Sequence, residues 1–265
     1  MEKGNIGERK DLILYFVITY AISWSLWLPK VLNSNGYEVP SIMLHLSNLA
    51  IFGPLIAALI LIARKREEIS IRRFLARVWD CSFDKKWFIP AIFLGPIIAL
   101  SAYLLNLYFF GGQFSLGISL PNIPLVAVII LFLGGPVEEF GWRGFALDKL
   151  QNRINATSAS LILGFIWAIW HLPLHFIEGT TQEIIPVYQF IMVTIALSVL
   201  YTWLYNSAKK SLLPVILFHW LGNLGAGVFI YWDNNSGRWI AFGITMLIAV
   251  VVIMIHGYKT LSKDK

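Results

Sequence analysis

Apolar residues fall into eight long runs along the chain, separated by short polar segments. The runs lie at about residues 12–29, 41–63, 87–110, 124–148, 157–177, 186–206, 211–230 and 238–258. Each run is close to the roughly 20 residues that an α-helix needs to cross a hydrocarbon core of about 30 Å. The pattern predicts an all-α fold, a polytopic membrane helix bundle of about eight transmembrane helices, in a single membrane domain over residues 1–265.

Basic residues gather in every second connecting segment. They precede the first run, fill the segment at residues 64–86, follow the fourth and sixth runs, and end the chain. Cytoplasmic loops keep an excess of Lys and Arg, so both termini are predicted to be cytoplasmic. Because the net charge of +6 comes from loops beside lipid headgroups, we expect contact with membrane lipid and no nucleic-acid partner.

Composition supports the membrane class. Apolar residues make up 57% of the chain and charged residues 14%, with a mean hydropathy of +0.69, whereas a soluble domain carries about 25% charged residues. We therefore expect a multi-pass protein of the cell membrane.

Within residues 71–78 the apolar side chains share a helical face, which fits either a short helix lying in the membrane interface or a solvated connector.

The fourth run holds the only formally charged side chains that lie away from the ends of the runs: Glu138, Glu139 and Arg143. Ionisable groups at membrane depth cost several kcal/mol unless they face the bundle interior and find partners. Glu139 and Arg143 are one helical turn apart and can pair, which leaves Glu138, about 100° away around the helix, for chemistry. The alternative is that all three form a buried electrostatic clamp that orients helices.

Gly134-Gly135-Pro136 interrupts this run just before the two glutamates. Glycine weakens a helix and proline removes a backbone donor, so the pattern predicts a kink or a restart. A helix that restarts with Pro136 in its first turn would place both glutamates near its positive end.

Two later runs carry candidate polar side chains. His219 and Asn223 lie four residues apart and share a helical face, where an imidazole and a carboxamide can converge on one ligand. His171 and His175 have the same spacing, but Pro173 lies between them and His175 falls at the end of its run. We favour His171, leave the role of His175 open, and note that hydrogen bonding between helices is the structural alternative for all of them.

The three segments, in this order, resemble the CPBP family of intramembrane proteases, which groups CAAX prenyl proteases with bacterial Abi-type and bacteriocin-processing proteins. The similar motifs are Glu138-Glu139-Phe-Gly-Trp-Arg143, Trp167-Ala-Ile-Trp-His171 and His219-Trp-Leu-Gly-Asn223, within a core at about residues 124–230. Trp167 stands where the family usually has phenylalanine, and we expect its ring to keep the packing role.

The resemblance implies an intramembrane CAAX-type endopeptidase, in a family often called metalloprotease, that acts on a peptide or protein in or at the membrane. Its catalytic residues would be Glu138, Glu139, His171, His219 and Asn223, with Arg143 in support. In the preferred scheme Glu138 and His171 activate water while His219 and Asn223 stabilise the oxyanion. In the competing scheme zinc is bound by Glu138, His171 and His219.

Two further classes stay open. One is a non-catalytic membrane protein that confers bacteriocin immunity by binding, and the other is a secondary transporter, since broken helices with carboxylates also bind ions. No inverted repeat supports the transporter.

Counting about 1.5 Å per residue puts His219 nearer the cytoplasmic face than His171, so the joint site requires kinks or unequal tilts. The sequence leaves the substrate and the oligomeric state open.

Overall fold

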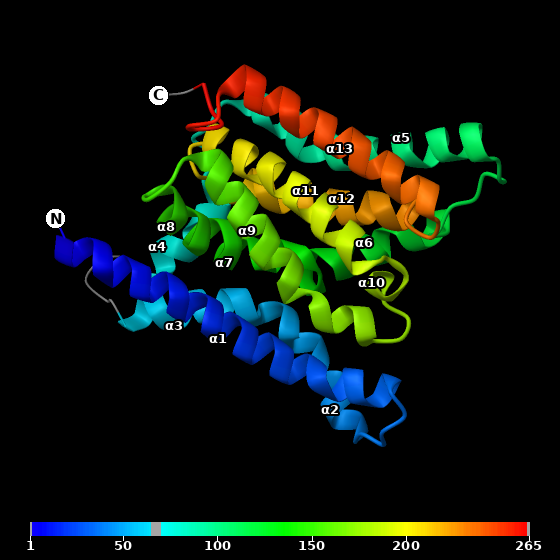
Figure 1. Cartoon of the computed structure of the whole chain (residues 1–265), viewed down its shortest axis with the longest axis horizontal. Helices are drawn as coiled ribbons and strands as arrows, with labels where there is room; N and C mark the ends of the chain where they lie inside the picture. The colour runs from blue at the N-terminus through cyan, green and yellow to red at the C-terminus, as the bar shows by residue number, and fades with distance from the viewer. Residues whose placement is uncertain (1, 65–69, 264–265) are drawn as a thin grey trace.

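The computed structural model describes residues 2–64 and 70–263, without the side chains of residues 2–8, and this part of the chain is helical with no strand. Lys65, Arg66 and Lys265, which contribute to the predicted charge alternation, lie outside the described residues, as does the side chain of Lys3. The helices are arranged as a bundle in which the C-terminal α13 lies beside α5 and α11 (Figure 1).

The first helices of the chain are α1 (Glu2–Ser34), α2 (Ser41–Leu46), η1 (Ser47–Phe52), α3 (Gly53–Arg64), α4 (Ile71–Ala76), η2 (Arg77–Trp79), η3 (Lys85–Trp87) and α5 (Phe88–Phe110). The fourth apolar run forms a broken helix over residues 120–151, which contains η4 (Leu120–Asn122), α6 (Ile123–Leu133), η5 (Gly135–Val137), α7 (Glu138–Gly141), η6 (Trp142–Leu147) and α8 (Asp148–Gln151). The remaining helices are α9 (Ala156–Trp170), η7 (Leu172–Phe176), α10 (Thr181–Ile184), α11 (Val187–Ser207), α12 (Leu213–Val228) and α13 (Asn235–His256).

Seven helical segments of the described chain are long and apolar enough to cross a membrane. The eighth predicted span corresponds to α12, which has 16 residues and, at about 1.5 Å per residue, is shorter than a hydrocarbon core. Lys209 and Lys210 take left-handed conformations just before it, with φ of 51° and 64°, and this reversal delays its start. Beyond Val228 the chain leaves the helical conformation at Phe229.

Local sequence signals set several helix ends. The Asn155 side chain accepts a hydrogen bond from the backbone N–H of Ser158 at the start of α9, and Asn234 does the same for Gly237 at the start of α13. Such side chains satisfy N–H groups that the first turn leaves without a helical partner. Helix α13 ends at His256, and the next residue, Gly257, has a φ of 78°, in the left-handed region that favours glycine.

Small residues lie where the long helices cross. A Cβ on Gly95 of α5 would lie 2.6 Å from the Cα of Gly222 in α12, and one on Gly164 of α9 would lie 2.8 Å from the Cβ of Ser198 in α11. Lipid supplies no hydrophobic force between helices, so their association depends on close van der Waals contact. These crossings hold α12, which carries His219 and Asn223, and α9, which ends just before His171, against their neighbours.

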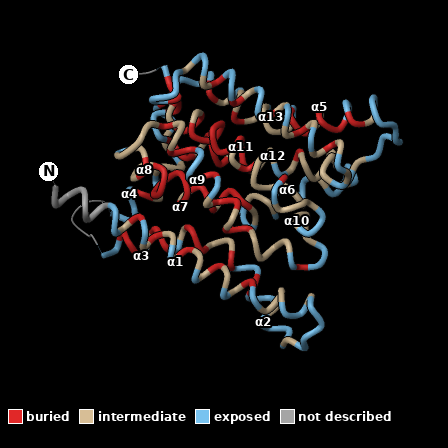
Figure 2. The backbone as a smooth tube through the Cα atoms, viewed as in Figure 1, coloured by how far each residue is buried: buried red, intermediate tan, exposed pale blue. Residues whose placement is uncertain are grey.

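The outer surface is apolar while charge is buried inside. Phe132, Leu247 and Met254 are 65%, 65% and 78% exposed, whereas Glu139 and Arg143 are fully buried. Buried residues are concentrated around α7, α9 and α11 (Figure 2). An apolar exterior with satisfied backbone is what a lipid environment requires.

The short helix predicted within residues 71–78 is present as α4 and η2. Ser70 caps it by accepting a hydrogen bond from the backbone N–H of Arg73 at 3.2 Å. Phe74 is 2% exposed, and Arg77 donates to the carbonyl oxygen of Gly144 at 2.8 Å. These contacts tie the segment to η6, so it is not a solvated connector; its position relative to a lipid interface stays a prediction.

Candidate active site

The predicted interruption at Gly134-Gly135-Pro136 is confirmed. Helix α6 ends at Leu133, Gly134 has an extended backbone with φ of −113° and ψ of −166°, and the 3-10 turn η5 follows. Helix α7 then begins at Glu138, which places Glu138 and Glu139 in its first turn. The following turn, η6, is a π-helix, a local widening that was not predicted and that often occurs at functional sites.

Glu139 is the centre of a buried ion network. Its Oε1 accepts hydrogen bonds from Nη1 of Arg143 at 3.0 Å and from Nδ1 of His219 at 2.7 Å. The Arg143 guanidinium also lies 4.5 Å from the ring centroid of Trp167 and 4.2 Å from that of Tyr201. A carboxylate and two aromatic faces therefore compensate for the lost hydration of this arginine, and the expected Glu139–Arg143 pair is present.

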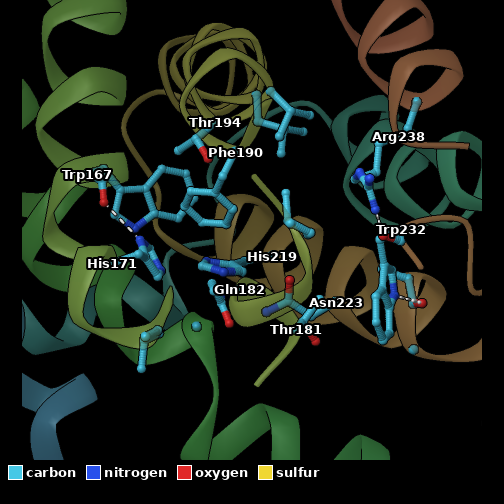
Figure 3. Close-up of a pocket in the computed structure, with 18 of the residues that line it drawn as sticks. Trp167, His171, Thr181, Gln182, Phe190, Thr194, His219, Asn223, Trp232 and Arg238 are labelled. Atoms are coloured by element: carbon cyan, nitrogen blue, oxygen red, sulfur yellow. Dashed lines mark hydrogen bonds between the residues drawn. The ribbon is translucent and has the colours of Figure 1, made fainter. Parts of the chain in front are cut away.

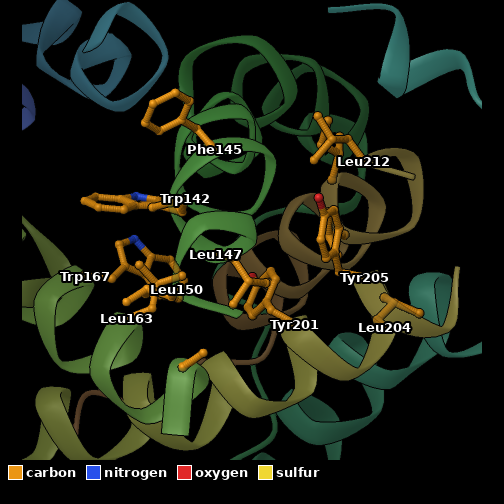
Figure 4. Close-up of a cluster of buried hydrophobic side chains, with 14 of the residues drawn as sticks. Trp142, Phe145, Leu147, Leu150, Leu163, Trp167, Tyr201, Leu204, Tyr205 and Leu212 are labelled. Carbon is orange, nitrogen blue, oxygen red and sulfur yellow. The ribbon is translucent and has the colours of Figure 1, made fainter. Parts of the chain in front are cut away.

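Glu138 points to a different set of partners. Its Oε2 accepts hydrogen bonds from the indole N–H of Trp167 at 2.8 Å and from that of Trp142 at 3.3 Å. The sequence assigned Trp167 a packing role only, because no local pattern links residues 29 positions apart. Among the described residues no hydrogen bond is made to Oε1 of Glu138, so one carboxylate oxygen keeps its acceptor capacity. Trp142, Trp167 and Tyr201 belong to the cluster of buried hydrophobic side chains in Figure 4.

Both candidate histidines are oriented through Nδ1. In His171 this atom lies 2.8 Å from the carbonyl oxygen of Trp167; a carbonyl only accepts, so Nδ1 carries the hydrogen and Nε2 is left for other chemistry. In His219 the Nδ1–H donates to Glu139, again leaving Nε2. The rings of His171 and His219 lie 5.7 and 5.5 Å from the Trp167 ring, so this tryptophan packs against both.

These side chains meet in one cavity of about 510 Å³. Glu138, His171, His219 and Asn223 all line it, together with apolar residues that include Val126 and Ile130. Figure 3 shows the two imidazoles and the Asn223 carboxamide around this hollow. His171 and His219 therefore reach one cavity in the folded chain despite the expected difference in depth, and the break in the fourth run brings Gly135 against the Nε2 edge of the His219 ring.

Three of the predicted residues lie beside the cavity without lining it. Glu139 and Arg143 are fully buried behind His219. His175 does not line the cavity itself, but it is bound through Nδ1 to the carbonyl oxygen of Ile185 at 3.1 Å and packs on Phe190, and both of these residues line the cavity. Its position fits a supporting role.

Sequence reasoning missed Tyr201 and Gly135. Tyr201 contacts Arg143, Trp167 and His219, yet a tyrosine inside an apolar run gives little signal. Gly135 was read as a helix breaker, but its contact with His219 adds a second reason for glycine: a Cβ there would lie 1.8 Å from Nε2 of the imidazole.

The zinc scheme requires Glu138, His171 and His219 to offer free ligand atoms to one metal ion. Within the described residues no group of three His, Cys, Asp or Glu side chains is arranged to hold a metal ion. The Nδ1 atoms of His171 and His219 are both engaged, and Oε2 of Glu138 accepts two indole hydrogens. Nε2 of each imidazole and Oε1 of Glu138 are therefore the atoms that a metal would have to use, and metal dependence stays a prediction for experiment.

Residues 120–225 match a family model described as type II CAAX prenyl endopeptidase Rce1-like. The chain carries an Rce1-like domain. This domain spans the broken helix, α9, α11 and the part of α12 that ends just beyond Asn223, so it contains every residue of the candidate site. The resemblance stated from the motifs is confirmed, and with seven apolar helices of spanning length the chain is a multi-pass integral membrane protein.

Relatives resemble the chain well beyond the Rce1-like domain. A protein of Methanococcus maripaludis named CAAX prenyl protease 2 is 28% identical over 252 residues, which cover 91% of this chain and 92% of the relative. A protein of Staphylococcus haemolyticus named lysostaphin resistance protein A is 23% identical over 271 residues, which cover 96% of this chain and 69% of the relative. The Rce1-like family supports protease activity on a membrane-associated peptide or protein.

Proposed function

We propose that this chain is an intramembrane endopeptidase in which Glu138 and His171 activate water to hydrolyse a peptide bond of a membrane-tethered or lipidated substrate. The supporting observation is that Glu138, His171, His219 and Asn223 line one cavity of the Rce1-like domain. A base, a second proton acceptor and two donors are the groups that peptide hydrolysis by water needs.

In this scheme the nucleophilic water lies between the Glu138 carboxylate and Nε2 of His171. The two indoles hold Oε2 of Glu138 in place, so the other oxygen takes the proton as the water oxygen bonds to the scissile carbonyl carbon. His171, fixed by its bond to the Trp167 carbonyl, accepts a hydrogen bond from the same water and orients it. General base catalysis of this kind contributes about 10² to 10⁴-fold in rate.

The oxyanion that forms would receive hydrogen bonds from Nε2 of His219 and the Asn223 carboxamide. His219 already donates from Nδ1 to Glu139, so donation from Nε2 requires a ring with both protons. The cluster then holds the anions Glu138 and Glu139 and the cations Arg143 and His219, which sum to zero charge. A neutral cluster costs less within a membrane than a charged one.

Collapse of the intermediate completes the reaction. The C–N bond breaks, and the proton that Glu138 took from water passes to the leaving amine nitrogen. Glu138 returns to its carboxylate form, so atoms and charge balance over one turnover.

The cavity favours a lipidated or membrane-embedded substrate. Its lining is largely apolar, and it lies within helices that carry apolar outer surfaces. A relative is named CAAX prenyl protease 2, so a prenylated peptide ending in a CAAX tail is the first substrate to test.

The test compares cleavage of a prenylated CAAX peptide by the purified chain and by Glu138→Gln, which keeps the side-chain shape but removes the base. We expect Glu138→Gln to lose at least about 10²-fold in kcat. Glu38→Gln is the matched control, because Glu38 is exposed on a loop and does not line the cavity. Full activity of Glu138→Gln would refute the mechanism.

Metal dependence is tested separately, by exhaustive chelation followed by metal analysis and the same assay. The scheme above predicts full activity with no bound metal. Activity that falls on chelation and returns with zinc would replace it with the metal-assisted scheme.

A resistance role is the second candidate, since the chain is 23% identical to lysostaphin resistance protein A. Protection of cells by expression of the chain would support it. If protection persists in both Glu138→Gln and His171→Ala, binding without cleavage is sufficient for that role.

A further inference from the structure

A second cavity, of about 530 Å³, lies at the opposite end of the bundle from α10. Residues of α1, α3, α4, α8 and the turn between α11 and α12 enclose it, toward the side of Figure 1 where α4 and α8 are labelled. Its lining includes none of the candidate catalytic residues. The segments around it are the ones that the charge pattern places on the cytoplasmic side.

Five cations line this cavity: Arg73, Arg77, Lys149, Lys209 and Lys210. Three carboxylates also line it, from Asp11, Asp80 and Asp148. The cavity therefore has an excess of positive charge.

One of these carboxylates already serves several partners. Asp148 pairs with Arg77 at 3.4 Å and with Lys210 at 2.9 Å, and it accepts a hydrogen bond from the Tyr205 hydroxyl at 3.0 Å. Arg77 also donates to the Tyr205 hydroxyl, to the Lys210 carbonyl and to the Gly144 carbonyl. Arg77 and Asp148 thus form the structural base of the cavity.

The other three cations are held less firmly, although Lys209 lies within electrostatic range of Asp80. Lys209 donates to the carbonyl oxygen of Ser82 at 3.3 Å, and the Lys149 ammonium lies 5.0 Å from the Phe145 ring. Within the described residues, Arg73, Lys149 and Lys209 form no ion pair with a carboxylate. An anion that enters the cavity would meet these three cations without displacing an existing ion pair.

The floor of the cavity is apolar. Leu61 and Ile62 of α3, Phe74 of α4 and Phe145 of η6 line it, and each is less than 9% exposed. Nearby, Trp79 is 80% exposed, as expected for a tryptophan at a membrane interface. Cations above an apolar floor match a ligand with a phosphate headgroup and an acyl chain.

We propose that this cavity binds the phosphate headgroup of an anionic phospholipid. Basic pockets between helices on the cytoplasmic side take such headgroups. The apolar floor favours a lipid over a free phosphate ion, because only the lipid has a chain to cover it. The site does not depend on the proposed protease activity.

The experiment is titration of the detergent-solubilised chain with dioleoylphosphatidylglycerol or dioleoylphosphatidylcholine, with binding read by native mass spectrometry. We expect the anionic lipid to bind more tightly. Each lysine removed should weaken its binding about fivefold, the equivalent of about 1 kcal/mol per basic residue near a lipid surface. Lys149→Gln with Lys209→Gln should therefore lose about 25-fold for phosphatidylglycerol and leave phosphatidylcholine unchanged.

The matched control is Lys85→Gln with Lys86→Gln, two lysines outside the cavity lining. It should bind both lipids as the parent chain does. Equal binding of phosphatidylglycerol by the Lys149/Lys209 double variant and the parent, when both show the same thermal unfolding midpoint, would overturn the proposal.

A second arm separates the sources of phosphate. Inorganic phosphate and glycerophosphoglycerol are added as competitors at concentrations equal to the lipid. We expect neither to displace phosphatidylglycerol, and displacement by either would assign the cavity to a free phosphate compound.

Discussion

Replacement of Gly135 by alanine tests whether the position of His219 matters for activity. Gly135 does not take a left-handed conformation, so alanine is compatible with its backbone. The added Cβ, however, would lie 1.8 Å from Nε2, 2.2 Å from Cε1 and 2.6 Å from Cδ2 of His219. The effect of this change is therefore steric and is directed at one imidazole.

The required movement follows from these distances. An ordinary contact of 3.4 Å needs the His219 ring to withdraw by about 1.6 Å, the difference between 3.4 and 1.8 Å. The Nδ1 bond to Glu139 is 2.7 Å long and would lose its geometry through a shift of this size. A misplacement of about 1 Å in an active site can cost about 10²-fold in rate, so we expect Gly135→Ala to lose at least about that factor in kcat.

The assay is cleavage of the prenylated peptide by Gly135→Ala, His219→Ala and the double variant. If the alanine acts only through His219, the double variant should be no slower than His219→Ala alone. Gly243→Ala is the matched control, because a Cβ at Gly243 meets nothing within 4 Å. Parent-like activity of Gly135→Ala would refute the placement of His219 in the reaction.

The other predictions concern the partners of the two glutamates and the oxyanion donor. Trp167→Phe keeps a ring over Arg143 but removes the 2.8 Å hydrogen bond to Glu138. Because hydrogen bonds to charged groups contribute about 1.5–3 kcal/mol, we expect kcat to fall about tenfold or more. Trp142→Phe, which removes a 3.3 Å bond to the same oxygen, should lose less kcat, and equal losses in the two variants would contradict this order. Glu139→Gln leaves the fully buried Arg143 without its carboxylate and should lower the free energy of unfolding by about 3–5 kcal/mol, measured as a lower thermal unfolding midpoint; an unchanged midpoint would argue against the buried pair. Asn223→Ala should lower kcat by about 10² to 10³-fold if the carboxamide stabilises the oxyanion, with an unchanged unfolding midpoint, and a change in KM alone would assign Asn223 to substrate binding.

Charge inside an apolar run was enough to select the candidate residues. Glu138, Glu139 and Arg143 stood out because burial of an ionised group is costly wherever it occurs, and the spacing of His219 and Asn223 on one helical face is a local property. The break before Glu138 was also predictable, because Gly134-Gly135-Pro136 acts through its own backbone.

The length of the last but one span was not predictable in the same way. Residues 211–230 are mostly apolar, yet α12 has only 16 residues. Its start depends on the left-handed turn at Lys209 and Lys210, which hydropathy does not record. The π-turn η6 at Trp142–Leu147 was missed for a similar reason, since its sequence is compatible with an ordinary helix.

By itself the sequence determined the class of protein, the approximate positions of the helices and the polar residues worth testing, because helix length and the cost of burying charge depend on local composition. The tertiary structure decided which of these residues meet. The bond of His219 to Glu139 joins positions 80 apart and that of Trp167 to Glu138 joins positions 29 apart, and such contacts depend on how helices tilt, break and approach at small residues. These long-range geometric relations create the common cavity of Glu138, His171, His219 and Asn223.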